Sequence, residues 1–163
     1  IETADVVVIA PGSLYGSLAP ALIVPGIGDA LRTSNAVKIY VCNLVTKPGQ
    51  TDGYDVADFA DEIERLAGGA FLDAVLYNTE KPTDELMDKY AKAGEKSVAF
   101  HEEKFDGKSY VAVGSNLLAG SIWQNSSTAD PIANSRTLIR HDSGVVANAI
   151  IELYDDIRSR QQA

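Results

Sequence analysis

The chain has 163 residues, of which 45% are hydrophobic and 23% charged, the proportions of an ordinary globular domain with its own core. Its net charge of −9 argues against general binding to nucleic acid or to an anionic membrane, because phosphate groups select clustered Lys and Arg. No apolar run reaches membrane-spanning length, and the single cysteine, Cys42, excludes an internal disulfide. We therefore expect one cytoplasmic α/β domain over residues 1–163, without membrane insertion.

The first predicted strand, Val6–Ala10, is a β-branched apolar run that ends at a Pro-Gly-Ser turn. The turn after such a strand is where open α/β sheets hold phosphates and nucleotides. Gly12 allows a ligand to approach the backbone closely, and Ser13 offers a hydroxyl and a peptide N–H. Alone, this pattern is weak, because most Gly-Ser turns after strands are only turns.

The rest of the chain alternates strand-like and helix-like patterns. Further strands are predicted at Val37–Cys42, Ala74–Tyr77, Val98–Phe100, Tyr110–Val113 and Thr137–Arg140. Helices are predicted at Asp55–Ala67, Thr83–Ala93 and Ser143–Ile157, with a proline-broken helix between Ser17 and Arg32 that restarts near Pro25. The alternation predicts a mostly parallel sheet covered on both faces, a three-layer α/β/α fold.

Two helices carry clear signals, and one segment does not fit the alternation. Asp55 is a plausible N-cap of its helix, which Gly68-Gly69 ends. The closing helix has one apolar stripe, formed by Val146, Ala149, Ile150, Leu153, Tyr154 and Ile157. Gly114–Ser135 is rich in Ser, Asn, Ala and Gly, and we interpret it as a long loop that acts as a lid or an interface element.

Three polar clusters follow predicted strands, at the edge where a doubly wound sheet brings its loops together. They are Gly12-Ser13-Leu14-Tyr15, Asn43 with the loop Pro48–Tyr54, and Arg140-His141-Asp142-Ser143. The second cluster is equally consistent with a connection in which Thr51, Asp52 or Asp55 only caps a helix. Arg140 is consistent with a surface ion pair or with a phosphate contact.

The residues give little support for catalysis or for a metal cage. His101 and His141 show no metal-binding spacing, and one cysteine cannot form a structural zinc site. Ser13, His141 and an Asp could formally make a triad, but Ser13 lacks the G-x-S-x-G turn of such nucleophiles. Asp52 could hold a divalent cation through a bound phosphate, or be a turn carboxylate. We assign no catalytic residue.

The segments that contain these three clusters resemble CofD-like proteins, and more closely their YvcK or gluconeogenesis-factor branch. The matching segments are IETADVVVIAPGSLYGSLAPALIVPGIGDALR, KIYVCNLVTKPGQTDGYDVADF, AVLYN, KYAKAGEKSV and LIRHD. The resemblance implies a Rossmann-like fold that binds a nucleotide or a UDP-sugar, such as UDP-N-acetylglucosamine or UDP-glucose. It further implies a cytoplasmic protein of carbon metabolism, envelope synthesis and cell shape.

The resemblance also implies ligand-binding residues and a missing part. The ligand would contact Gly12, Ser13, Leu14, Tyr15, Asn43, Thr51, Asp52, Tyr54, Tyr90 and Arg140. No cofactor is required, although magnesium could accompany a bound nucleotide at Asp52. The family's Gly-rich GGGTG-type beginning and its DDGGSSG-type segment are not found, so the chain resembles only the later part of such a protein. Whether a homo-oligomer or a separate N-terminal half completes it stays open.

Three hypotheses follow for function. The first is a UDP-sugar-binding regulatory protein of the gluconeogenesis-factor type. The second is a magnesium-dependent enzyme that resembles 2-phospho-L-lactate transferase and uses a donor linked to guanosine diphosphate. The third is a folded fragment without independent ligand binding.

Overall fold

The computed structural model describes residues 1–120 and 139–161. Its centre is a four-stranded, wholly parallel sheet in the order β1-β2-β3-β4. The register pairs Val6 with Val37, Ile39 with Ala74, and Ala74 with Val111. The strands are β1 (Val6–Ile9), β2 (Val37–Val41), β3 (Ala74–Asn78) and β4 (Val111–Ser115). All carboxyl ends therefore meet at one edge of the sheet.

Helical segments form the outer layers. The α-helices are α1 (Ala19–Leu22), α2 (Ile27–Thr33), α3 (Val56–Leu66), α4 (Asp84–Lys92) and α5 (Ser143–Gln161). A short π-helix η1 (Leu14–Leu18) precedes α1, and a 3-10 turn η2 (Glu102–Phe105) precedes β4. Among the described helices, none alone is long and apolar enough to cross a membrane, although Leu14–Leu22 and Ile27–Thr33, bent by 76°, pass on length and composition as a pair.

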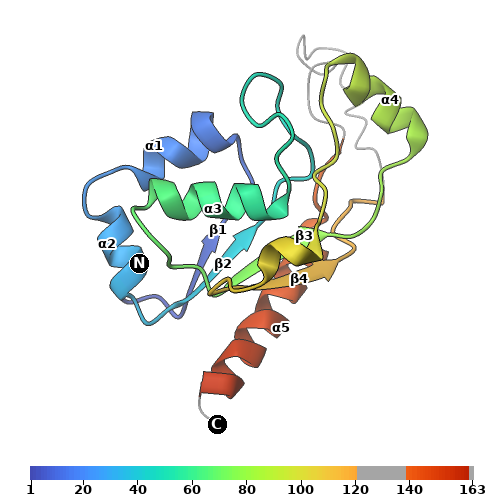
Figure 1. Ribbon diagram of the computed structural model, residues 1–163. Coiled ribbons are helices and arrows are strands. Elements are labelled where there is room, and N and C mark those ends of the chain that lie inside the picture. Colours follow the sequence, from blue (N-terminus) through green and yellow to red (C-terminus); the bar gives the residue numbers. More distant parts are fainter. Residues whose placement is uncertain (121–138, 162–163) are drawn as a thin grey trace, which may run out of the picture.

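The two faces of the sheet carry separate cores. One core joins Tyr40 and Val75 of the sheet to Leu22, Leu31 and Phe59 of α1, α2 and α3. The other core joins Val37, Ile39, Val41 and Leu76 to Leu153 of α5. Figure 1 shows α1, α2 and α3 on one side of the sheet and α5 on the other. The predicted three-layer α/β/α fold with a parallel sheet is confirmed.

Strand order explains why the layers are unequal. Connections between neighbouring parallel strands are almost always right-handed. Because β1 to β4 are added in one direction across the sheet, these connections place α1, α2 and α3 on the same face. The opposite face is left to α5, which reaches it only after the last strand.

Local sequence signals set the helix boundaries. Pro20 lies in the first turn of α1, and Gly26, at the N-cap of α2, has a φ of 90°, a left-handed conformation that favours glycine. The helix is therefore broken as predicted, and its second piece begins just after Pro25. Asp55 caps α3 as expected and forms a reciprocal capping box with Asp58.

Two predicted strands are wrong. Val98–Phe100 is not part of the sheet: the Val98 amide donates to the Leu44 carbonyl and Val56 donates to Ala99, so the segment crosses the carboxyl edge instead. Ile139 and Arg140 are not in a strand, and the neighbouring His141 forms a single antiparallel bridge with Leu118. Thr137 and residue 138 lie outside the described residues.

The loop predicted at Gly114–Ser135 begins later than expected. Gly114 and Ser115 pair with Tyr77 and Asn78 as the last residues of β4. The prediction ended the strand too early because glycine is uncommon inside strands. Glycine fits position 114 because a Cβ there would lie 2.9 Å from the Tyr77 hydroxyl. Residues 121–135 lie outside the described part.

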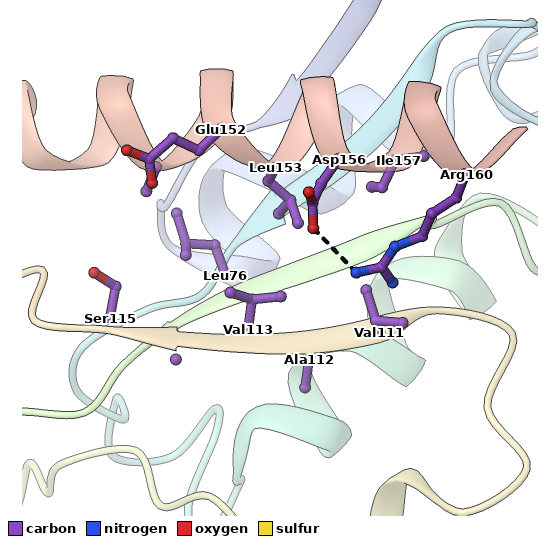
Figure 2. A pocket seen from close by; sticks show the side chains of 12 residues that line it. Leu76, Val111, Ala112, Val113, Ser115, Glu152, Leu153, Asp156, Ile157 and Arg160 are labelled. Atoms are coloured by element: carbon purple, nitrogen blue, oxygen red, sulfur yellow. Dashed lines mark hydrogen bonds and ion pairs between the residues drawn. The ribbon is translucent and has the colours of Figure 1, made fainter. Parts of the chain in front are cut away.

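On the α5 side, a groove of about 550 Å³ lies between α5 and β4 (Figure 2). Leu76, Val111 and Val113 form its floor, while Leu153 and the ion-paired Asp156 and Arg160 come from α5. None of the predicted site residues lines this groove. It reflects how little of this face one helix covers.

Candidate functional site

A cavity of about 560 Å³ opens at the carboxyl edge of the sheet, and we call it the edge cavity. It brings together four predicted site residues from three distant segments: Gly12 and Ser13 after β1, Asn43 after β2, and Arg140 before α5. The prediction that loops at this edge line one crevice therefore holds for these residues.

Asn43 fixes the geometry of two loops at once. Its side-chain amide donates to the Gly12 carbonyl at 2.7 Å, and its Oδ1 accepts from the Tyr40 hydroxyl at 3.0 Å. Tyr40 is fully buried, so this pair anchors the turn after β1 to the core. Asn43 thus shapes the cavity wall, with both of its side-chain groups already engaged.

Arg140 and His141 reach the cavity through a short antiparallel contact. The Ala119 amide donates to the Arg140 carbonyl at 2.9 Å, and Asp142 donates to Leu117 at 2.8 Å. Asp142 then caps α5, because its Oδ1 accepts from the amides of residues 144 and 145. The segment that carries Arg140 is therefore held between the end of β4 and the start of α5.

His141 is half-buried and lies against β2. Its Nε2 is 3.1 Å from the Cys42 carbonyl oxygen, which can only accept, so Nε2 carries the hydrogen. Burial lowers the pKa of His141, and the bond to Cys42 opposes this only in part. The neutral ring then has an unprotonated Nδ1, which can accept a hydrogen bond.

Three predicted site residues have side chains with structural partners. Leu14 is buried in the core on the α3 side. The Thr51 hydroxyl accepts from the Lys47 amide at 2.8 Å and closes the loop after β2. The Tyr90 hydroxyl accepts from the Ile139 amide at 3.0 Å, so Tyr90 supports the residue next to Arg140. None of the three lines the edge cavity.

The other three predicted residues lie beside α3. Tyr15 donates to Glu62 at 2.9 Å and lies 3.0 Å from the Tyr54 hydroxyl. The Tyr54 bond, burial and Glu62 together raise the pKa of Tyr15 well above its usual value. Tyr54 and Asp52 line a separate, acidic hollow of about 420 Å³ with Asp58, Asp61 and Glu62.

The residues at Asp52 do not assemble a metal cage. Asp52 Oδ2 accepts from the Gly49 amide at 2.6 Å, which is the bond of a turn carboxylate. Among the residues that the structure describes, no group of three or more His, Cys, Asp or Glu side chains is arranged to hold an ion. We therefore derive no step through magnesium.

The sequence reading missed Lys47 and Glu95. Lys47 lines the edge cavity together with Arg140, and Glu95, just after α4, adds a carboxylate to the same lining. Lys47 directly precedes the Pro48-Gly49 turn, so extending the second polar cluster by one residue would have included it. Glu95 carried no signal, because its place depends on how α4 folds back toward the sheet.

The chain is similar to a known protein family and to several known proteins. Residues 1–118 match the family described as 2-phospho-L-lactate transferase CofD. The chain is 37% identical over 157 residues to a putative gluconeogenesis factor of Thermotoga maritima, covering 92% of this chain and 44% of the relative. It is 33% identical to the gluconeogenesis factor of Bacillus subtilis, with 94% and 44% covered.

A solved structure shares the fold. The crystal structure of a member of the UPF0052 family from Bacillus halodurans matches with a TM-score of 0.78 and 33% identity. The match covers 92% of this chain and 44% of that structure. The chain thus spans less than half the length of the relatives it matches.

Proposed function

This chain belongs to the CofD family, and we propose that its edge cavity binds the phosphate part of a nucleotide sugar of the UDP-N-acetylglucosamine or UDP-glucose type. The proposed role is regulatory, in carbon metabolism and envelope formation in the cytoplasm. Its curated relatives are called gluconeogenesis factors, which supports the metabolic part of the proposal.

One observation carries the proposal. Lys47 and Arg140 line the same cavity as the Gly12-Ser13 turn, at the carboxyl ends of parallel strands. Two cations at one cavity are notable in a chain of net charge −9. Phosphates bind where Arg and Lys converge with glycine-rich turns, because charge-assisted bonds and close backbone approach act together.

His141 offers a contact of another kind. Its neutral Nδ1 is suited to accept a hydrogen bond from a hydroxyl, while its other nitrogen is held by Cys42. A ligand with phosphates and sugar hydroxyls would use both the cations and this acceptor. The sequence analysis left two ways to complete the site, a homo-oligomer or a separate N-terminal half, and the proposal is compatible with both.

The test is thermal unfolding of the protein with UDP-N-acetylglucosamine, UDP-glucose and guanosine diphosphate, each with and without magnesium. A ligand at a hundredfold excess over its Kd stabilises a protein by about 2.7 kcal/mol. UDP-sugar stabilisation without magnesium supports the proposal. No shift with any ligand would mean that this chain binds none of them by itself.

Arg140→Ala provides the residue-level check. We expect UDP-sugar affinity to fall by about tenfold to a hundredfold, because one charge-assisted phosphate contact is lost, while the free energy of unfolding changes little. Arg160→Ala is the matched control, since Arg160 is exposed and paired with Asp156 on α5. Equal losses of binding in both variants would contradict the assignment of Arg140.

A second candidate is favoured by the family description itself, which is that of a 2-phospho-L-lactate transferase. Such an enzyme would use a guanosine diphosphate-linked donor. A magnesium-dependent response to guanosine diphosphate, with no response to UDP-sugars, would favour it over the binding role.

A further inference from the structure

Glu95 is an acidic side chain in a cavity that the proposed function fills with phosphate. It lines the edge cavity together with Lys47 and Arg140. Cations attract a phosphate and a carboxylate repels it, so phosphate binding alone does not account for Glu95. Its carboxylate forms no hydrogen bond or ion pair with another residue of the described part of the chain. The charge of Glu95 therefore acts on whatever enters the cavity.

The backbone on both sides holds Glu95 in place. At the end of α4, its amide donates to the Tyr90 carbonyl at 3.0 Å, and Gly94 has a φ of 78°, the left-handed conformation with which many helices end. Directly after it, the Lys96 amide donates to the Thr46 hydroxyl at 3.1 Å, and the Lys96 carbonyl accepts from the Thr46 amide at 2.8 Å. Glu95 is thus set between the end of α4, which lies beyond the carboxyl ends of the strands (Figure 1), and the loop after β2.

The same contact relates Glu95 to Lys47. Val45 and Ser97 form an antiparallel bridge. Continuing this register by two residues along each segment places Glu95 opposite Lys47. Residues that are opposite each other in an antiparallel pair have their side chains on the same side, which agrees with the presence of both in the lining of one cavity.

The charged side chains leave this lining with a small net charge. Lys47 and Arg140 are positive, Glu95 is negative, and His141, whose pKa is lowered by burial, is neutral. A sugar diphosphate carries about two negative charges, because both of its phosphates are esterified or bridged. A free nucleoside diphosphate carries about three at neutral pH, because a terminal phosphate loses a second proton above a pKa of about 6. Glu95 therefore opposes the free diphosphate more strongly.

The carboxylate also provides what a sugar needs. An ionised carboxylate only accepts hydrogen bonds, and sugar hydroxyls donate them. We propose that Glu95 makes the edge cavity selective for a sugar diphosphate over the free nucleoside diphosphate, because it accepts bonds from sugar hydroxyls and repels the additional charge of a terminal phosphate. Specificity is a difference between two affinities, and one residue here acts on both. This inference rests on the proposed function.

The test is isothermal titration calorimetry of the wild-type protein, Glu95→Gln and Glu95→Ala with UDP, UDP-glucose and UDP-N-acetylglucosamine. Magnesium is left out, because a bound cation would neutralise phosphate charge. In Glu95→Gln, UDP should bind about tenfold more tightly, because the repulsion is removed. The affinity for the UDP-sugars should change by less than about threefold, because the amide oxygen still accepts a hydrogen bond. In Glu95→Ala, which has no acceptor, the UDP-sugars should bind about tenfold more weakly than in Glu95→Gln.

Glu152→Gln is the matched control. It removes the same charge from an exposed position on α5, which lines the groove beside β4 and not the edge cavity. Both affinities should then stay close to those of the wild type. The melting temperature of each variant without ligand should stay within about 2 °C of the wild type, because neither change removes a contact from the fold.

Three results would overturn the inference. One is that Glu95→Gln changes the affinities for UDP and for the UDP-sugars by the same factor. Another is that Glu152→Gln changes their ratio as much as Glu95→Gln does, which would make the effect one of overall charge. Both leave the proposed function standing. If the wild-type protein binds none of the three ligands, the proposed function is wrong, and the selectivity assigned to Glu95 is wrong with it.

Discussion

At the scale of single residues, His141 links the site to stability. Its ring is held by the Cys42 carbonyl in a half-buried place between β2 and the start of α5. Charging it there is unfavourable, because burial removes part of the water that would solvate the imidazolium. Protonation of this one side chain therefore opposes folding.

A pH dependence follows from this. The pKa of His141 lies below 6.5 in the folded protein, so as pH falls the unfolded chain binds the proton first. Its contribution to the free energy of unfolding is full above pH 6.5 and declines below it. Measured about one pH unit above and below that value, denaturant unfolding should show a larger difference in the wild type than in His141→Gln, which cannot titrate.

His141→Gln is suited to this comparison because its amide nitrogen can still donate to the Cys42 carbonyl. An identical pH slope in both proteins would mean that His141 titrates equally in the folded and unfolded states. The lowered pKa would then have no thermodynamic effect.

Gly28 shows a second residue-scale constraint, of purely steric origin. It lies in α2, and a Cβ there would overlap the Ala67 carbonyl oxygen and lie 2.9 Å from its carbon. Because the obstacle is backbone, Gly28→Ala should lower the free energy of unfolding by about 1–3 kcal/mol. Gly144→Ala, where the nearest atom is 3.4 Å away, should cost little or stabilise α5. Chemical denaturation measures both, and equal effects would contradict the steric argument.

At the scale of elements, α5 depends on one narrow stripe. The predicted stripe of Val146, Ala149, Ile150, Leu153, Tyr154 and Ile157 does pack against the sheet. Leu153 is 8% exposed, however, whereas Ile151 on the other side is 58% exposed. The long helix is thus attached mainly through its central residue.

Leu153→Ala should therefore cost about 2–4 kcal/mol of unfolding free energy and expose α5 to limited proteolysis. Ile151→Ala, on the same helix, should change stability by less than about 0.5 kcal/mol, since its side chain is mostly in water. Similar losses in the two variants would show that α5 is held by a different face.

Helices and strands with strong local signals were predictable from sequence, whereas segments placed by tertiary contacts were not. The capped helix at Asp55 and the apolar runs of β1, β2 and β3 combine local propensity with periodicity. Val98–Phe100 has strand composition as well, but the Phe100 ring stacks on Tyr77 with centroids 4.2 Å apart, and the neighbouring backbone bonds to Leu44 and to Val56 of α3 instead of to a strand. A run of three residues is too short for its pattern to predict whether it pairs with a strand or bonds elsewhere.

At the scale of the whole molecule, the candidate site also has a part that the sequence predicts and a part that only tertiary contacts decide. That polar loops gather at the carboxyl edge follows from parallel topology, and Gly12, Ser13, Asn43 and Arg140 do meet there. The hydroxyl of Tyr15 turns instead to Glu62 on α3. Such choices depend on where each loop curls after its strand. They are decided by contacts between residues tens of positions apart, which no short window contains.

The site also has a definite place in the whole molecule. The Gly12-Ser13 turn leaves the carboxyl end of β1, which is an edge strand among the described ones. Asn43, which holds this turn, follows the neighbouring strand β2. The edge cavity therefore begins at one side of the described sheet.

The bridge between Leu118 and His141 has a consequence for how the chain can vary. The bonds from Ala119 to Arg140 and from Asp142 to Leu117 tie the two ends of residues 120–139 together. Both bonds join backbone groups, so they do not depend on which side chains stand at these positions. The side chain at Ala119 can thus vary during evolution while the guanidinium-bearing segment keeps its place.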